Sequence, residues 1–263
     1  MKTRDLLFRG ALALGLACFM NSGAADLAGA EFSAEMLQRG PDGSTTGRMF
    51  VGDGRMRVEV SRQGRELVRI TDEEEGVEWV LFPEERRFIE HAFSEQAAGA
   101  LGAIESKETP CSGMPGFECR KLDEGIVQGR PATRWEIRGS HQGQTYTSTQ
   151  WIDTERGIPL IQELPNGQRT ELKFIGNEDI DGRDVEKWEM VVTAPNRPET
   201  RTYQWYDPEL ELAIKQEFPG GVVNELRNIQ VGEQPDDLFV VPEGYTRMAP
   251  PRRQGEAPGY PSR

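Results

Sequence analysis

The side chains that most often carry catalysis are few in this chain and far apart in its sequence. Its 263 residues include two histidines and three cysteines. His91 follows a strand pattern and His141 lies in a turn, while no Gly-x-Ser-x-Gly elbow, phosphate loop or His-Glu-x-x-His helix occurs. Nucleophilic catalysis needs a nucleophile, a base and an orienting group held together. We therefore assign no catalytic residue and expect a protein that is not an enzyme.

One acidic stretch imitates the start of a calcium-binding loop. The run 177–182 places oxygen-bearing side chains at alternate positions, but the twelfth position of the loop, which needs a bidentate glutamate, is Trp188. A solvated connection between strands accounts for this run, and the acidic run 72–75 is expected at an exposed hairpin tip. Because histidine and cysteine ligands are also scarce, we expect no metal site and no cofactor.

The N-terminal segment has the pattern of an export signal. Three basic residues precede the apolar run 11–20, and small residues follow up to Ala25. This is the order of a secretory signal peptide, and the run is shorter than the roughly 20 residues that span a bilayer. We expect cleavage after Ala25 rather than after Ala30. A lipoprotein signal would need leucine three places before Cys18, where Gly15 stands, so we predict a periplasmic protein without a lipid anchor.

Charge and hydropathy exclude two classes of partner. The formal net charge is -13, so the chain lacks the clustered basic residues that a sequence-independent nucleic-acid binder needs. No stretch after the export signal approaches eighteen apolar residues, which argues against an integral membrane protein.

Four prolines and four arginines from residue 247 onward, against one glutamate, predict a disordered tail over 249–263.

Cys111 and Cys119 stand eight positions apart with glycines and a proline between them. In an oxidising compartment such a pair indicates a disulfide, and the alternative redox motif Cys-x-x-Cys is absent. Loop-closure entropy for so short a ring corresponds to about 2.5 kcal/mol of stabilisation. The sequence therefore predicts a structural disulfide between Cys111 and Cys119.

The second half of the chain contains a duplication. Segments 126–175 and 179–229 align at a spacing of 53 residues that becomes 54 after a hairpin loop: Trp135 matches Trp188, and Trp151 matches Trp205. A duplicated four-strand unit explains this alignment, because an extra residue is tolerated in a surface loop.

Period-two alternation of apolar and polar residues predicts a mainly β protein. Roughly a dozen strands in meander order form one large antiparallel sheet, which is expected to curl and to have one charged, solvated face and one apolar, concave face. A single helix, at 92–105, is expected to cover it. The strand patterns are 31–36, 46–51, 55–60, 66–71, 77–82, 87–90, 133–138, 144–152, 160–164, 170–175, 188–193, 200–206, 212–218 and 222–229.

Several short patterns together resemble uncharacterised bacterial periplasmic proteins with the fold of the LolA/LolB-like lipoprotein carriers. They are Phe32–Met36, the 47–59 hairpin, the turn 81–84, the Trp-x-Asp and Gly-x-Pro-Leu pattern within 151–160, and the run from Pro235 to Tyr245. The resemblance implies a β half-barrel over residues 26–248 and an apolar concave face that holds acyl chains. It places no functional residue of the carriers on this sequence.

Aromatic and sulfur-containing residues on the predicted strands are the candidate ligand-binding residues. Trp79, Trp135, Trp188 and Met190 fall on strand positions from which they could line an apolar groove. The competing interpretation is that the repeated tryptophans are core anchors, since duplicated units reuse their packing.

These observations lead to one main hypothesis and two alternatives. The main one is a periplasmic protein that binds lipid or lipoprotein acyl chains, because each methylene removed from water is worth about 0.8 kcal/mol and no charged pocket is required. The first alternative is a non-catalytic domain of the cell envelope that binds other proteins or acts as a sensor. The second is an enzyme of unrecognised type.

Overall fold

The computed structural model of the chain describes residues 30–41, 43–62, 64–92, 110–111, 116–141 and 144–249. The predicted signal peptide, the helix expected at 92–105 apart from its first residue, and the tail beyond Ala249 lie outside these residues. The chain divides into two compact units. Beyond residue 26, unit 1 comprises 37–44 and 98–227, and unit 2 comprises 27–36, 45–97 and 228–263.

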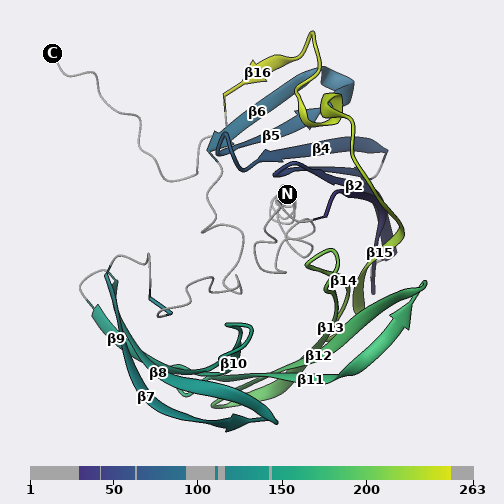
Figure 1. The fold of residues 1–263 in the computed structure, drawn as a ribbon. Coiled ribbons are helices and arrows are strands. Elements are labelled where there is room, and N and C mark those ends of the chain that lie inside the picture. Colours follow the sequence, from purple (N-terminus) through teal and green to yellow (C-terminus); the bar gives the residue numbers. More distant parts are fainter. Residues whose placement is uncertain are drawn as a thin grey trace, which may run out of the picture. The chain divides into compact units, whose positions relative to one another are not determined.

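Unit 1 is built around a run of antiparallel strands, drawn in teal and green in Figure 1. Its strands are β7 (Phe117–Val127), β8 (Arg130–His141), β9 (Gln144–Asp153), β10 (Pro159–Glu163), β11 (Arg169–Ile180), β12 (Arg183–Ala194), β13 (Arg197–Asp207) and β14 (Leu212–Phe218). Three further strands have residues in both units: β1 (Phe32–Gly40), β2 (Gly43–Gly52) and β15 (Val222–Val231).

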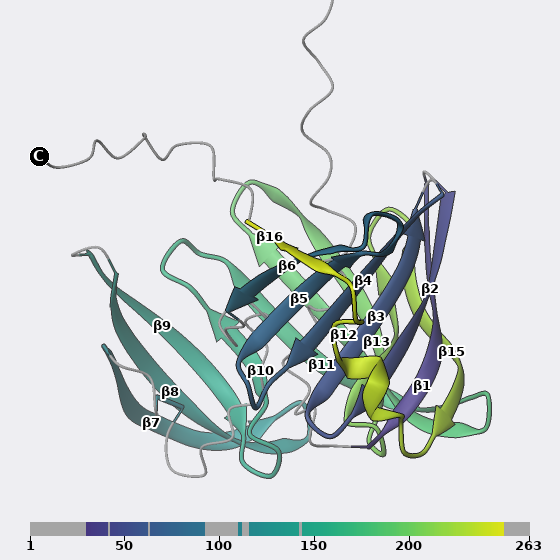
Figure 2. The ribbon, with the colours of Figure 1, turned by 90° about the horizontal axis from the view of Figure 1, so that it is seen from above.

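Unit 2 contains an antiparallel meander and the C-terminal segment, which is yellow in Figure 2. Its elements are β3 (Arg55–Arg62), β4 (Arg65–Asp72), β5 (Val77–Phe82), the 3-10 helix η1 (Pro83–Glu85), β6 (Arg87–Ala92), the 3-10 helix η3 (Asp236–Phe239) and β16 (Thr246–Met248). The acidic run 72–75 lies at the turn between β4 and β5, where an exposed hairpin tip was expected.

Hydrogen bonding joins the strands of the described residues into one sheet of sixteen. Their order is β16-β6-β5-β4-β3-β2-β1-β15-β14-β13-β12-β11-β10-β9-β8-β7. The mainly β, meander-ordered sheet predicted from the sequence is confirmed, with one difference. β16 pairs parallel to β6, so the sheet is mixed rather than wholly antiparallel. This pair exists because the chain returns to the first meander after β15.

The C-terminal return is held in unit 2 by one aromatic residue. Phe239 is 1% exposed and packs in a cluster with Val68, Ile70 and Leu81. The Arg55 guanidinium lies over its ring at 4.9 Å, and Arg57 Nη1 donates a hydrogen bond of 2.8 Å to the carbonyl of Leu238. The segment after β15 therefore buries apolar surface of β4 and β5 and is hydrogen-bonded to β3 through Arg57, instead of leaving the sheet.

Two tight turns set the start of the duplicated segments in unit 1. Gln128 and Gly129 join β7 to β8, and Asp181 and Gly182 join β11 to β12; all four have positive φ, between 52° and 82°. Two consecutive residues with positive φ define the turn that matches the twist of a hairpin. Each turn is followed at once by an arginine, which begins the next strand.

Candidate functional site

The two faces of the unit 1 sheet differ sharply in charge. Side chains opposite one another on neighbouring strands share a face. One face, here called the charged face, carries ion pairs: Arg201 with Glu189 at 2.7 Å and Lys187 with Glu178 at 2.8 Å between neighbouring strands, and Lys215 with Glu217 at 2.8 Å within β14. Such exposed pairs keep this face solvated and are worth little individually.

Trp151 and Trp205 both lie on the charged face, as their matched repeat positions predict. Lys187 Nζ and Lys215 Nζ lie over the Trp205 ring at 4.7 and 4.2 Å, and the Arg134 guanidinium lies 6.0 Å from the Trp151 ring. The flat faces of these rings are therefore used by cations of the same sheet.

The opposite face, here called the amide face, carries tryptophan and neutral amides in two rows that cross the strands. In the first row Trp135 is opposite Gln150, Gln150 opposite Gln162, and Gln162 opposite Thr170. The second row repeats the order at the matched positions, as Trp188, Gln204, Gln216 and Asn224.

Few of these amides are hydrogen-bonded through their side chains within the described residues. Gln38 Nε2 donates to Asn224 Oδ1 at 3.1 Å, which extends the second row to β1. The Oε1 atom of Gln150 and the Nδ2 atom of Asn224 are buried without a partner. An unpaired buried polar atom costs roughly 1–3 kcal/mol, so these two atoms are exceptions to the usual pairing.

Apolar side chains lie between the two rows on the amide face. Leu172 is opposite Met190, and Phe174 is opposite Trp188, with ring centroids 5.2 Å apart. Phe174 is 43% exposed although it is a large hydrophobic residue. Leu172 and Met190 are half-buried. This part of the face therefore offers apolar surface beside neutral hydrogen-bonding groups.

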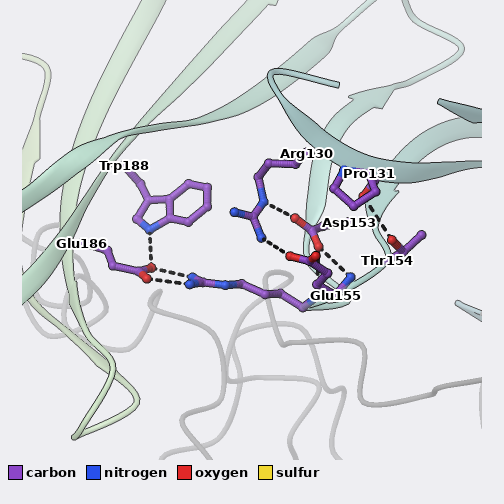
Figure 3. A network of polar contacts seen from close by, with 8 residues as sticks. Arg130, Pro131, Asp153, Thr154, Glu155, Glu186 and Trp188 are labelled. Carbon is purple, nitrogen blue, oxygen red and sulfur yellow. Dashed lines mark hydrogen bonds and ion pairs between the residues drawn. The ribbon is translucent and has the colours of Figure 1, made fainter. Parts of the chain in front are cut away.

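Besides the Lys121–Glu124 pair on β7, an ion pair between Arg156 and Glu186 lies on the amide face, and Figure 3 shows its surroundings. Arg156, in the turn after β9, donates hydrogen bonds of 2.5 and 2.6 Å to both carboxylate oxygens of Glu186. Trp188 Nε1 donates to Glu186 Oε2 at 3.1 Å. The hydrogen bonds from Arg156 lower the pKa of Glu186 against the effect of burial, while burial raises the pKa of Tyr206 on the facing strand.

A second polar cluster occurs in each repeated segment. Asp153 Oδ2 accepts a hydrogen bond from Arg130 Nε, and its Oδ1 accepts 2.8 and 3.0 Å bonds from the backbone N–H groups of Glu155 and Arg156. Burial opposes ionisation of Asp153, but these hydrogen bonds outweigh it and lower its pKa. The cluster fixes the turn from which Arg156 reaches Glu186.

The matching cluster uses the same residue types at the corresponding positions. Asp207 Oδ2 accepts from Arg183 Nε, and Asp207 Oδ1 accepts from the backbone N–H groups of Glu209 and Leu210 at 2.9 and 3.2 Å. The position of Arg156 is taken by Leu210, which is 4% exposed. The ion pair with Glu186 therefore has no counterpart in the second segment.

The structure brings three of the four candidate ligand-binding residues to one face. Trp135, Trp188 and Met190 all lie on the amide face. Trp135 and Trp188 are separated by β9, β10 and β11, which at the usual strand spacing is roughly 19 Å. Trp188 is 3% exposed and packs in a core cluster with Ala132 and Leu160. Trp135 and Met190 are half-buried.

The fourth candidate, Trp79, belongs to unit 2. It packs against the cluster of Val68, Ile70, Leu81 and Phe239, and its Nε1 donates to Glu90 at 3.1 Å. Trp79 is therefore a candidate of unit 2, whereas the other three belong to unit 1.

The predicted disulfide is present. Cys111 and Cys119 are bonded, with their Cα atoms 5.8 Å apart. Cys119 lies on β7, two residues after Phe117. The ring of Phe117 meets the ring of Tyr146 on β9 edge to face, with the centroids 6.1 Å apart. The disulfide therefore ties the chain that precedes β7 to the last strand of the sheet.

Within the described ranges, no group of three or more histidine, cysteine, aspartate or glutamate side chains is arranged to hold a metal ion. None of the helices in the same ranges is long and apolar enough to cross a membrane.

No protein-family model and no curated protein matches this chain. Solved structures do. A LolA superfamily protein from Nitrosomonas europaea is 13% identical, with a TM-score of 0.36 over 82% of this chain and 94% of that one. A Vibrio parahaemolyticus domain named for outer-membrane lipoprotein sorting is 13% identical, with a TM-score of 0.32 over 84% and 92%. These structures carry the fold name that the sequence resemblance gave.

A third similar structure is MucB of Pseudomonas aeruginosa, solved in complex with MucA. It is 13% identical, with a TM-score of 0.22 over 85% of this chain and 95% of that chain. At these identities the likeness concerns the fold alone.

Sequence reasoning missed the two amide rows. The spacing of 54 residues that relates Trp151 to Trp205 also relates Gln150 to Gln204 and Gln162 to Gln216. That spacing was the available signal, but only the pairing register shows that these glutamines stand side by side.

Proposed function

We propose that the protein is an exported, periplasmic carrier-like protein that binds the acyl chains of lipid or lipoprotein on the amide face of unit 1. It acts by binding and not by catalysis. The single observation that carries the proposal is the apolar surface exposed on the amide face, opposite the ion pairs of the charged face of the same sheet. Ion pairs fill the charged face, whereas Phe174, Leu172 and Met190 leave apolar surface on the other.

The energetics favour an acyl chain as the occupant. About half of a C16 chain, removed from water, contributes roughly 6 kcal/mol before ordering costs. This contribution needs no charged partner. Phe174 and Met190 supply flexible and aromatic surface of the kind that adapts to an acyl chain.

The experiment is lipid analysis of the protein purified from the periplasm of a bacterial host. We expect co-purifying acyl lipids by native mass spectrometry and solvent extraction, and saturable binding of dansyl-labelled undecanoic acid. A protein that carries no lipid and does not bind the labelled acid would refute the proposal. N-terminal sequencing of the same sample tests cleavage after Ala25.

A second candidate function is binding of another envelope protein. The observation that favours it is the outer edge of β7, the last strand in the sheet order of the described residues, where Ile126 is 71% exposed. An exposed strand edge can pair with a strand of a partner. Loss of a captured envelope protein on substitution Ile126→Pro, with the acyl binding unchanged, would support this function.

A further inference from the structure

The two rows of the amide face have a composition that an acyl chain does not explain. Each row runs from a tryptophan across two glutamines to Thr170 or Asn224, and each is one residue wide over four neighbouring strands. An acyl chain neither donates nor accepts hydrogen bonds. We propose that the first of these rows, from Trp135 to Thr170, forms a binding site for a neutral, hydroxyl-bearing ligand, namely a sugar chain or the sugar headgroup of a lipid.

The unused hydrogen-bonding capacity of the rows is the first argument. The side-chain amides of Gln150, Gln162, Gln204 and Gln216 form no hydrogen bond with the described part of the chain. Gln150 Oε1 is a buried acceptor without a donor, and Asn224 Nδ2 is a buried donor without an acceptor, in a residue 1% exposed. These two atoms lie on β9 and β15, six strands apart in the sheet order, so one sugar does not reach both; in the first row a ligand beside Gln150 and Gln162 meets donors and acceptors together.

The chemistry of the hydroxyl group meets this requirement. Each hydroxyl carries one donor and two acceptor positions, and each primary amide carries donors and an acceptor side by side. An ester or a carboxylate only accepts, so it leaves Gln150 Oε1 unpaired. The four residues of each row are uncharged, and Lys121, which stands opposite Trp135 on β7, is already paired with Glu124, so the rows lack a free charge for binding an ion.

The spacing and the tryptophans agree with a sugar. Neighbouring strands place successive amides about 4.8 Å apart along a row, which is close to the advance of one hexose unit in an extended chain. Trp135, half-buried at the head of the first row, offers an aromatic surface for the C–H groups of a sugar ring. The second row is nearly closed, because Trp188, Gln216 and Asn224 are 3%, 6% and 1% exposed, so the half-buried first row is the one that a ligand reaches.

The site shares the amide face with the proposed acyl site but does not depend on it. Leu172 and Met190 lie beside the first row, so a glycolipid would use the row for its sugar and this apolar surface for its acyl chains. A free sugar chain would use the row alone. These two sources present the same hydroxyl chemistry and are separated by experiment.

The test uses the purified full chain and the double variant Gln150→Met with Gln162→Met, which keeps side-chain volume and removes the amides. The matched control is Gln230→Met, an exposed glutamine of β15 in unit 2. Soluble maltoheptaose, cellohexaose and chitohexaose are titrated by calorimetry. Vesicles of phosphatidylcholine with and without monogalactosyl diacylglycerol are tested by co-sedimentation.

We expect the unaltered protein to bind a soluble oligosaccharide or the galactolipid vesicles, which identifies the source. Loss of two hydrogen bonds should weaken this binding about tenfold or more in the double variant, while the control stays unchanged. The proposal is overturned if neither source binds, or if the double variant binds as well as the unaltered protein. Thermal unfolding checks that the variant folds. Binding of dansyl-undecanoic acid should persist in the variant, which separates failure of this site from failure of the acyl site.

Discussion

Arg156 donates two hydrogen bonds to the carboxylate of Glu186, thirty residues further along the chain. The pair ties the turn after β9 to β12, and its guanidinium lies 5.9 Å from the ring of Trp188. In the matched repeat positions stand Leu210 and Thr133, which cannot form an ion pair. The duplicated segments thus share their backbone plan but differ in how the turn is fastened to the sheet.

Removing Arg156 should destabilise the protein. The Glu186 side chain is 11% exposed, so the variant Arg156→Leu leaves a buried carboxylate with one indole donor, at a cost of about 1–3 kcal/mol. The double variant Arg156→Leu with Glu186→Thr copies the residues of the other segment and should lose less. Urea unfolding measures both, and a larger loss in the double variant would contradict the interpretation.

The stability of the protein should fall in acid. The pKa values of Glu186 and Asp153 lie below their ordinary values of 4.5 and 3.8 in the folded chain, so the unfolded chain takes up protons first as the pH drops. Their contribution is complete above about pH 5 and is lost below it. Urea midpoints measured down to about pH 3 should show the loss, and Glu186→Gln should make it shallower.

The two aspartate clusters should contribute alike. Asp207→Ala removes the partner of Arg183 and the acceptor of two backbone N–H groups, and we expect a loss of about 2 kcal/mol in unfolding free energy. Asp153→Ala should cost a similar amount. Asp184→Ala, at an exposed position of β12, is the control and should stay within about 0.5 kcal/mol of the unaltered protein.

The disulfide should stabilise the chain through the entropy of its unfolded state. For the double variant Cys111→Ser with Cys119→Ser we expect a loss of about 2.5 kcal/mol. Chemical denaturation with and without reductant provides the measurement. Reductant should shift the unaltered protein and leave the variant where it is; an equal response of both would contradict the assignment.

A charge placed on the amide face should abolish acyl binding. Met190→Lys puts an ammonium group beside Leu172, where an acyl chain would have to desolvate it, and we expect at least about a tenfold weaker affinity for dansyl-undecanoic acid. Thr147→Lys adds the same charge to an exposed position on the charged face and serves as the control. Equal affinities in the two variants would place the acid elsewhere.

Local pattern determined much of the strand content. The strands predicted at 77–82 and 212–218 have those bounds in the structure, and Trp135 and Trp188 share a face, as do Trp151 and Trp205, because alternation along a strand is fixed by the covalent backbone. The spacing of Cys111 and Cys119 was enough to predict their bond. β7 and β16 were not predicted: β7 is rich in charged residues at the edge of the sheet, and β16 has only three residues.

Only the tertiary structure decided which side chains became neighbours. The register between strands, shifted by bulges such as the one between Phe174 and Gly176, aligned the glutamines into rows and set Glu186 within reach of Arg156. It also enclosed Trp188, for which the sequence favoured a core position over a ligand-binding one. Alternation along a strand decides which face of the sheet a residue occupies. Its neighbour on the adjacent strand depends on hydrogen bonds between segments far apart in the chain.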